Sequence, residues 1–314
     1  MVTGNVKRIS SHQLPLIGPG ESLRELLIAS VKKRIPANNT PFGVFLSGGL
    51  DSSILAQILI SLNANAIFYL LGEDGKSDDL LVAKLLVKHL DIINYRITPL
   101  PSREQFPCLI EEVVRSTESF NPSIISNGIC THLLSKAAKE DNLKIIVSGE
   151  GADELFGGYN YQNIDDDWRL FKDNLLSDMN FTELRRVDLS CMNNSIEARF
   201  PYLDKDVYSF AHGLEHKDLY SIYGTVPMNK YILRKAFENY LPKEIVWRKK
   251  TSSDVGDGIR KIVVNYLTRD NESEKIVLKR IWEKIYPHYP LDHYFHSYPC
   301  FDSVIANRSV VHKS

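Results

Sequence analysis

The amino-acid sequence predicts an α/β fold: a parallel sheet of about five strands with flanking helices, followed by a mainly helical C-terminal half. Three observations support this prediction. Short apolar runs alternate with segments of helical periodicity in the first half of the chain, which is typical of βαβ units. Two of these runs lead directly into glycine- and serine-rich loops. From about residue 166 onward, helical patterns dominate.

The composition is that of an ordinary globular protein. Of 314 residues, 43% are apolar and 25% are charged, so neither disorder nor a coiled coil is expected. The 38 basic and 39 acidic residues leave a net charge of −1, which argues against a general binder of nucleic acid or membrane surfaces. The N-terminus has no apolar signal-peptide core, and no run of 18 apolar residues could span a bilayer. We therefore expect a cytoplasmic protein.

The cysteines and histidines give no metal signature. The four cysteines lie far apart without a C-x-x-C spacing, so neither a disulfide framework nor a structural zinc site is expected. His212 and His216 stand four residues apart on a predicted helix, but the sequence offers no further zinc ligands at a suitable spacing. We interpret both histidines as surface residues.

The elements follow in order along the chain. Residues 1–40 form a leader and a helix, 41–165 a nucleotide-binding α/β region, and 166–314 a helical part of the same domain. Apolar runs predict strands over 43–46, 66–71, 92–97 and 144–147. Helical periodicity predicts helices over 21–34, 54–62, 78–90, 104–117 and 130–140.

The loop after the first strand has the composition of an anion site. It reads Ser47-Gly48-Gly49-Leu50-Asp51-Ser52-Ser53. The glycines let the backbone approach an anion closely, and the following helix directs its N–H groups toward it. Asp51 would repel a bare phosphate, so we expect it to hold a Mg²⁺ ion that the phosphates share. The alternative is an ordinary glycine turn with an aspartate cap.

A second loop of this kind follows the strand at 144–147. It runs from Ser148 to Tyr159 and carries Glu150, Asp153 and Glu154. Both loops follow parallel strands and should therefore meet at the carboxyl edge of the sheet, where α/β folds bind ligands. Three carboxylates beside a phosphate site need cations, although an acidic helix cap is the simpler interpretation for Glu154.

Other nucleotide and hydrolase motifs are absent from the sequence. Gly75-Lys76-Ser77 imitates the end of a Walker A loop, but Leu70 stands where its first glycine belongs. The chain has no G-x-S-x-G nucleophile elbow and no G-x-G-x-x-G that opens a helix.

The two loops resemble a known family. Ser47–Ser53 resembles the pyrophosphate loop of the ATP pyrophosphatases (PP-loop, adenine nucleotide alpha hydrolase-like), and Ser148–Tyr159 resembles the second signature of asparagine synthetases. The similarity continues in order through roughly residues 21–312. Further blocks are Ser77–Ala83, Arg186-x-Asp188, Glu197–Asp204, Lys230-x-x-x-Arg234 and Trp247–Lys250.

The resemblance implies an activity and a set of site residues. In this family the carboxylate of an acid attacks the α-phosphorus of ATP, pyrophosphate leaves, and ammonia cleaves the acyl-adenylate to an amide and AMP. The resemblance implies ATP and Mg²⁺, with Asp51 and Asp153 as metal ligands. It implies ATP or pyrophosphate contacts at Phe45, Ser47, Gly48, Gly49, Asp51, Ser52, Leu70, Ser148 and Gly149.

Two residues match catalytic positions of the family. Lys250 matches a lysine that neutralises charge on the α-phosphoryl transition state, a step that depends on positioning and electrostatics. Glu150 matches a glutamate suited to accept a proton from the attacking amine. Without the family match, Lys250 would be interpreted as a solvated member of a basic run.

The nitrogen donor is open. Glutamine-dependent asparagine synthetases carry an N-terminal glutaminase domain with an exposed first cysteine, and this sequence shows no such segment. We therefore expect free ammonia, another amine or a separate glutaminase to supply nitrogen, and no nucleic-acid or membrane partner.

The segment associated with the acid substrate departs from the family pattern. Ser123 and Ser126 stand where the family has a threonine and an arginine. An arginine fork suits a carboxylate, so its loss predicts poor aspartate binding unless Arg115 or Arg199 replaces it. We expect the acid pocket to include Ser123, Ser126, Glu197 and Arg199.

Three functions remain open. The first is an AMP-forming, asparagine synthetase-like ligase that acts on an aspartate-like acid. The second is an amide ligase or cyclase for a non-aspartate acid in a specialised biosynthetic pathway. The third is a non-catalytic subunit that retains the fold. A tRNA thiolase or GMP synthetase is disfavoured by the asparagine-type blocks and the neutral charge.

Overall fold

A five-stranded parallel sheet forms the centre of the computed structural model, which describes residues 18–159, 168–250, 252–268 and 272–288. The strand order is β3-β2-β1-β4-β5. A separate antiparallel hairpin, β6-β7, lies in the later half. The strands are β1 (Phe42–Phe45), β2 (Ala66–Leu71), β3 (Tyr95–Thr98), β4 (Ile145–Val147), β5 (Glu197–Arg199), β6 (Ser221–Tyr223) and β7 (Val226–Met228).

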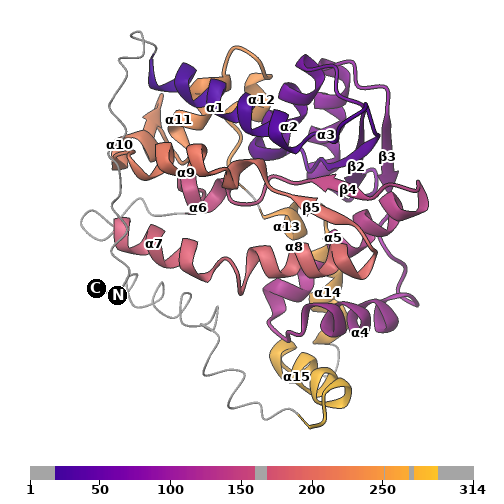
Figure 1. Cartoon of the computed structure of the whole chain (residues 1–314). Coiled ribbons are helices and arrows are strands. Elements are labelled where there is room, and N and C mark those ends of the chain that lie inside the picture. Colours follow the sequence, from indigo (N-terminus) through magenta and orange to yellow (C-terminus); the bar gives the residue numbers. More distant parts are fainter. Residues whose placement is uncertain (1–17, 160–167, 251, 269–271, 289–314) are drawn as a thin grey trace, which may run out of the picture.

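Helices cover both faces of this sheet (Figure 1). The helices of the first half are α1 (Pro19–Arg34), α2 (Leu50–Ser61), α3 (Asp78–His89), α4 (Phe106–Thr117), α5 (Pro122–Glu140) and α6 (Ala152–Phe156). Those of the later half are α7 (Trp168–Asp178), α8 (Glu183–Asn193), the 3₁₀ helix η1 (Pro201–Leu203), α9 (Lys205–His212), α10 (His216–Leu219), α11 (Tyr231–Phe237), α12 (Lys243–Val246), α13 (Ser253–Gly256), α14 (Ile259–Leu267) and α15 (Glu274–Ile285).

Alternate residues of the buried strands belong to two different cores. In β2, Phe68 and Leu70 pack with α1, α2 and α3, whereas Tyr69 and Leu71 pack with α4, α5 and α8. This alternation follows from the two-residue period of a strand that is covered on both faces. The sheet is therefore the middle of three layers.

The predicted strands and helices of the first half are confirmed, with differences at their ends. The third strand lies at 95–98 rather than 92–97, and α2 begins at Leu50 rather than 54. The helix predicted over 130–140 begins at Pro122, because Asn121 caps it by accepting hydrogen bonds from the backbone N–H groups of Ser123 and Ile124.

The sheet extends into the segment that was expected to be helical. Strand β5 pairs in parallel with β4 through Ile145↔Glu197 and Val147↔Arg199. The prediction of one helix through His212 and His216 was wrong, because α9 ends at His212 and α10 begins at His216. His216 instead lies against Trp168 and Tyr220.

Candidate active site

The first loop lies at the carboxyl end of β1, and a glycine in it allows close packing on α3. The backbone N–H of Leu46 donates to the carbonyl of Tyr69 at 2.9 Å, and α2 begins only four residues later. Gly48 has a φ of +76°, and a Cβ there would lie 2.6 Å from the backbone nitrogen of Ala83 on α3. Only glycine fits this close approach, so the loop packs directly on α3.

Serine hydroxyls fix the shape of this loop. The Oγ atoms of Ser47 and Ser52 lie 3.1 Å apart, and Ser52 and Ser53 both donate to the carbonyl of Gly49, at 3.2 and 2.7 Å. The N-terminus of the 12-residue helix α2 follows at once. A helix N-terminus behind a preshaped loop suits a phosphate group.

The second loop lies against the first. The backbone N–H of Ser148 donates to the carbonyl of Arg199, which continues the β4–β5 pairing into the loop. A Cβ on Gly149 would lie 3.2 Å from the Cβ of Asp51. The two loops that the sequence placed at one sheet edge therefore touch there, and the ends of β1 and β2 bring Phe45 and Leu70 to the same edge.

Lys230 joins the two predicted metal ligands. Its Nζ lies 2.5 Å from Oδ2 of Asp51 and 2.6 Å from Oδ1 of Asp153, and its side chain is 1% exposed. Lys230 precedes α11 with a φ of +52°, an uncommon conformation for a residue with a long side chain. In the sequence this lysine stands out only as part of the family block Lys230-x-x-x-Arg234, and that block alone predicts no role for it.

Lys250 reaches the same carboxylates from the solvent side. Its Nζ lies 2.6 Å from Asp153 and 3.9 Å from Asp51, and its side chain is 33% exposed. Burial opposes ionisation of Asp153, but Lys230 and Lys250 outweigh it and hold the pKa of that carboxyl well below its usual range. Burial likewise lowers the pKa of Lys250, but Asp153 and Asp51 raise it above its ordinary value. Asp153 and Lys250 therefore both favour their charged forms.

Two arginines brace the lysine-bearing segments. Arg234, which is 1% exposed, donates to the carbonyl of Asn229 at 2.6 Å and to the carbonyl of Arg248 at 3.0 Å. These carbonyls adjoin the backbone that carries Lys230 and Lys250. Arg248 in turn lies 2.8 Å from the buried carboxylate of Asp79 on α3, whose pKa burial raises to about 6 despite this arginine.

Glu150 lies away from the lysines and is paired with an arginine of α8. The Nη2 atom of Arg186 lies 3.4 and 3.2 Å from the two carboxylate oxygens of Glu150. Burial raises the pKa of Glu150 above its ordinary value, and Arg186 acts in the opposite direction. A half-buried carboxylate of raised pKa is suited to proton transfer.

Glu154 is buried one turn further on. Tyr159 donates to its Oε1 at 2.5 Å, and its side chain is 2% exposed. Burial raises the pKa of Glu154 to about 8, and the charges of Glu183 and Asp153 add to this shift. Glu154 is therefore protonated at neutral pH, in contrast to Asp153 beside it.

The four residues expected in the acid pocket lie in two places. Ser123 and Ser126 are on α5, where Ser126 is fully buried and its Oγ has no hydrogen-bond partner. Arg199 on β5 donates to Glu197 at 2.7 Å and to the carbonyl of Arg34 at 2.8 Å. Within the described residues, neither Glu197 nor Arg199 forms a hydrogen bond or ion pair with α5.

The described part of the chain contains no group of three or more His, Cys, Asp or Glu side chains arranged to hold a metal ion. Its two candidate ligands for Mg²⁺ are the carboxylates that share Lys230. None of the helices between residues 18 and 288 that the structure describes is long and apolar enough to cross a membrane.

Solved structures with weak similarity include an NMN synthetase from Francisella tularensis and a U34-tRNA thiolase from Methanococcus maripaludis. The synthetase is 13% identical with a TM-score of 0.43, and the match covers 86% of this chain and 94% of that one. The thiolase is 17% identical with a TM-score of 0.39, and the match covers 86% and 82%.

Sequence comparison gives a closer similarity to asparagine synthetases. A probable glutamine-hydrolysing asparagine synthetase of Schizosaccharomyces pombe is 33% identical over 75% of this chain and 47% of its own length. Asparagine synthetase B of Escherichia coli is 30% identical over 75% and 45%, and the enzyme of Gallus gallus is 30% identical over 86% and 49%. The chain thus spans about half the length of these relatives. The asparagine synthase family model matches residues 22–176 and 174–298, and the chain belongs to that family.

Proposed function

We propose that this protein uses ATP to adenylate a carboxylic acid and then converts the acyl-adenylate to an amide. The observation that carries the proposal is the meeting of Asp51 and Asp153 around Lys230, with Lys250 beside them. Two carboxylates and two ammonium groups at the edge of a phosphate-binding loop suit the transfer of an adenylyl group, which depends on positioned charge. Family membership supports an amide-forming ligase in general.

In the first step, a carboxylate oxygen of the acid attacks the α-phosphorus of ATP. The bond from that phosphorus to the bridging oxygen breaks, and pyrophosphate leaves with both electrons. Ser47, Gly48, Gly49 and Ser52 would cradle the pyrophosphate. Lys250, which is partly exposed and lies beside Asp153, would neutralise charge at the α-phosphoryl group.

Asp51 and Asp153 would hold Mg²⁺ during this step. Both supply the carboxylate oxygens that Mg²⁺ prefers, and both lie within reach of one cation in the structure. The bound ion would offset the negative charge of the triphosphate. Lys230 keeps the two carboxylates together and offsets part of their charge.

In the second step, the nitrogen of ammonia or an amine attacks the acyl carbon. The bond to the AMP oxygen breaks, AMP leaves, and Glu150 accepts the proton that the nitrogen loses. Arg186 favours the ionised form of Glu150 that this role requires. Ammonia could enter freely or come from a separate glutaminase, and we propose that the reaction takes place in the cytoplasm without a nucleic-acid or membrane partner.

The acid is proposed to differ from aspartate. The arginine that the family resemblance places on α5 is replaced by the fully buried Ser126, and Arg199 is engaged with Glu197 and Arg34. Arg115 on α4 is exposed to solvent. A lost charged contact of about 2–4 kcal/mol would weaken aspartate binding roughly 30- to 1,000-fold.

Pyrophosphate exchange over a panel of carboxylic acids tests the proposal and identifies the acid. Exchange should require one acid, and Asp51→Ala and Asp153→Ala should abolish it while the circular dichroism spectrum is retained. Asp206→Ala, at a side chain that is 51% exposed, is the control. The absence of exchange with every acid would favour the non-catalytic subunit. Asparagine formation from aspartate and ammonium with a low KM would overturn the non-aspartate acid.

A further inference from the structure

Tyr202 contacts both loops of the candidate site from the later half of the chain. It lies in η1, directly after β5, and its side chain is fully buried. Its hydroxyl donates to the backbone carbonyl of Asp51 at 3.0 Å. Its ring meets the ring of Phe156 edge-on, with the centroids 6.3 Å apart and an interplanar angle of 72°. One side chain therefore joins the first turn of α2 to α6, the helix that carries Asp153.

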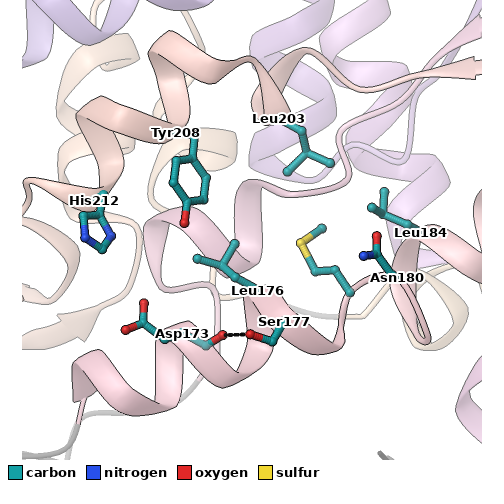
Figure 2. A pocket seen from close by; sticks show the side chains of 9 residues that line it. Asp173, Leu176, Ser177, Asn180, Leu184, Leu203, Tyr208 and His212 are labelled. Atoms are coloured by element: carbon teal, nitrogen blue, oxygen red, sulfur yellow. Dashed lines mark hydrogen bonds between the residues drawn. The ribbon is translucent and has the colours of Figure 1, made fainter. Parts of the chain in front are cut away.

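The next residue, Leu203, contacts the second loop as well. Figure 2 shows its side chain at the edge of a cavity of about 460 Å³ between α7, α8 and α9. A Cβ on Gly151, the N-cap residue of α6, would overlap this leucine, so Leu203 packs directly on the second loop. The 3₁₀ helix η1 is therefore in contact with the first loop through Tyr202 and with the second through both residues.

Helix α1 anchors η1 at both ends. Ser30 donates to the carbonyl of Pro201 at 2.6 Å, and Arg34 pairs with the carboxylate of Asp204 at 2.9 Å. The segment that carries Tyr202 is therefore fixed on a helix of the scaffold that belongs to neither loop. Supporting contacts of this kind allow one side chain to hold a neighbouring ligand residue in place.

The acceptor of the Tyr202 hydroxyl is one of the two candidate ligands for Mg²⁺. Asp51 is the second residue of α2, and its carboxylate shares Lys230 with the carboxylate of Asp153. A shift of the Asp51 backbone would change the separation of these two carboxylates. Mg²⁺ requires nearly octahedral geometry with oxygen ligands at about 2.0–2.1 Å, so its binding is sensitive to such a shift.

We propose that Tyr202 is a positioning residue that fixes the backbone of Asp51 relative to α6, so that Asp51 and Asp153 can bind one Mg²⁺ ion. The inference rests on the proposed function, because it concerns the metal that the adenylation step would use. Tyr202 supplies no ligand in this role and acts through Asp51.

Tyr202→Phe separates this role from simple packing. Phenylalanine retains the ring contact with Phe156 and loses only the hydrogen bond to Asp51. Tyr69→Phe is the matched control, because Tyr69 is also fully buried and its hydroxyl donates to Asp141 at 2.7 Å, in the core on the other face of the sheet. Both variants should lower the Tm, and only Tyr202→Phe should change the response to magnesium.

Calorimetric titration of ATP at a series of Mg²⁺ concentrations, without an acid substrate, measures this response in the absence of turnover. Tyr202→Phe should raise the Mg²⁺ concentration at which ATP affinity reaches half its limiting value about three- to tenfold, as expected for one lost hydrogen bond. Tyr69→Phe should leave this concentration unchanged. An unchanged Mg²⁺ dependence in Tyr202→Phe, or an equal shift in Tyr69→Phe, would overturn the proposal.

Pyrophosphate exchange with the acid found in the panel is the second readout. Tyr202→Phe should need more Mg²⁺ to reach its maximal rate, and that rate should stay within about twofold of the wild type. If exchange in the wild type succeeds and Tyr202→Phe has the same Mg²⁺ requirement, the role of Tyr202 fails and the proposed function is retained. If no acid supports exchange but the shift in ATP binding is observed, the proposed function fails and the role of Tyr202 is supported. ATP binding to the wild type that does not depend on Mg²⁺ would overturn both.

Discussion

Arg186 holds both carboxylate oxygens of Glu150 within 3.4 Å, and this pair connects α8 to the second loop. Burial raises the pKa of Glu150, and the charges of Glu183 and Asp153 raise it further, whereas Arg186 and Lys250 lower it. The arginine thus offsets part of the cost of keeping this half-buried carboxylate ionised.

Arg186→Gln should therefore move the acid limb of amide formation to higher pH. With the guanidinium removed, the pKa of Glu150 rises, so a higher pH is needed to deprotonate Glu150. Pyrophosphate exchange should keep its pH dependence, because the proposed adenylation step does not use Glu150. Single-turnover rates of both half-reactions between pH 5 and pH 9 measure this, and Arg186→Lys should restore part of the shift. A parallel change in both half-reactions would contradict the division of roles.

Lys230→Met should lower stability as well as adenylation. The substitution leaves the carboxylates of Asp51 and Asp153 without their buried partner, and the loss of one member of a buried ion pair costs about 3–5 kcal/mol. Thermal unfolding with and without magnesium and ATP measures this, and the added cation and nucleotide should recover part of the lost Tm. An unchanged Tm would show that the ion pairs of Lys230 with the two carboxylates do not stabilise the fold.

Lys250→Met should separate catalysis from stability. Its side chain is 33% exposed, so removal should change the Tm far less than removal of Lys230. The rate of adenylation should fall about 10²- to 10³-fold, as expected for the loss of one electrostatic donor. Comparison of pyrophosphate exchange and Tm in the two lysine variants measures this. A large loss of Tm with near-normal exchange in Lys250→Met would reverse the assignment.

Gly158→Ala should disrupt the charged cluster without removing any charge. A Cβ at this position would lie 1.6 Å from Oδ1 of Asp153 and 2.7 Å from Cε of Lys230, so these two side chains must shift from their paired positions. We expect loss of pyrophosphate exchange with a folded protein. Gly213→Ala is the control, because its Cβ would meet only the Phe210 carbonyl, at 3.5 Å, and the Ser209 carbonyl, at 3.9 Å. Equal exchange by both variants would count against the geometry of the site.

Glu154→Gln should stabilise the protein above neutral pH. The pKa of Glu154 is about 8 when folded, against 4.5 for an ordinary glutamate, so the folded state binds the extra proton between these values. The contribution to stability is fully present below pH 4.5 and is lost as the pH rises through 8. The Tm difference between variant and wild type should grow from pH 5 to pH 9. A constant difference would show that Glu154 does not titrate in this range.

The sheet was predictable where strands are apolar and buried, and unpredictable where they are not. Strands β1, β2 and β4 are apolar runs that both layers cover, and their sequence shows this directly. Strand β5 reads Glu197-Ala-Arg199 at the sheet edge, with both charged side chains partly or fully exposed. Its pairing comes from backbone contact with β4, which leaves no hydrophobic pattern to detect.

The candidate site was predictable for the loops and not for the cation between them. Glycines, serines and acids close together in sequence indicate a candidate phosphate loop, because their spacing is local. Lys230 reaches Asp51 across 179 positions, and a lone lysine is usually a solvated side chain. The available signal was its spacing from Arg234, whose guanidinium binds backbone carbonyls shortly before each of the two lysines.

The position of Lys230 also decides where this chain can be divided. Asp51 and Asp153 come from the first half of the chain, but the ammonium that pairs with both comes from the later half, as does strand β5. A fragment ending near residue 165 would retain both glycine-rich loops and expose the edge of β4 together with two uncompensated acids. We therefore expect the half that ends near residue 165 not to fold by itself, and recombination between related proteins to be tolerated only where both halves are inherited together.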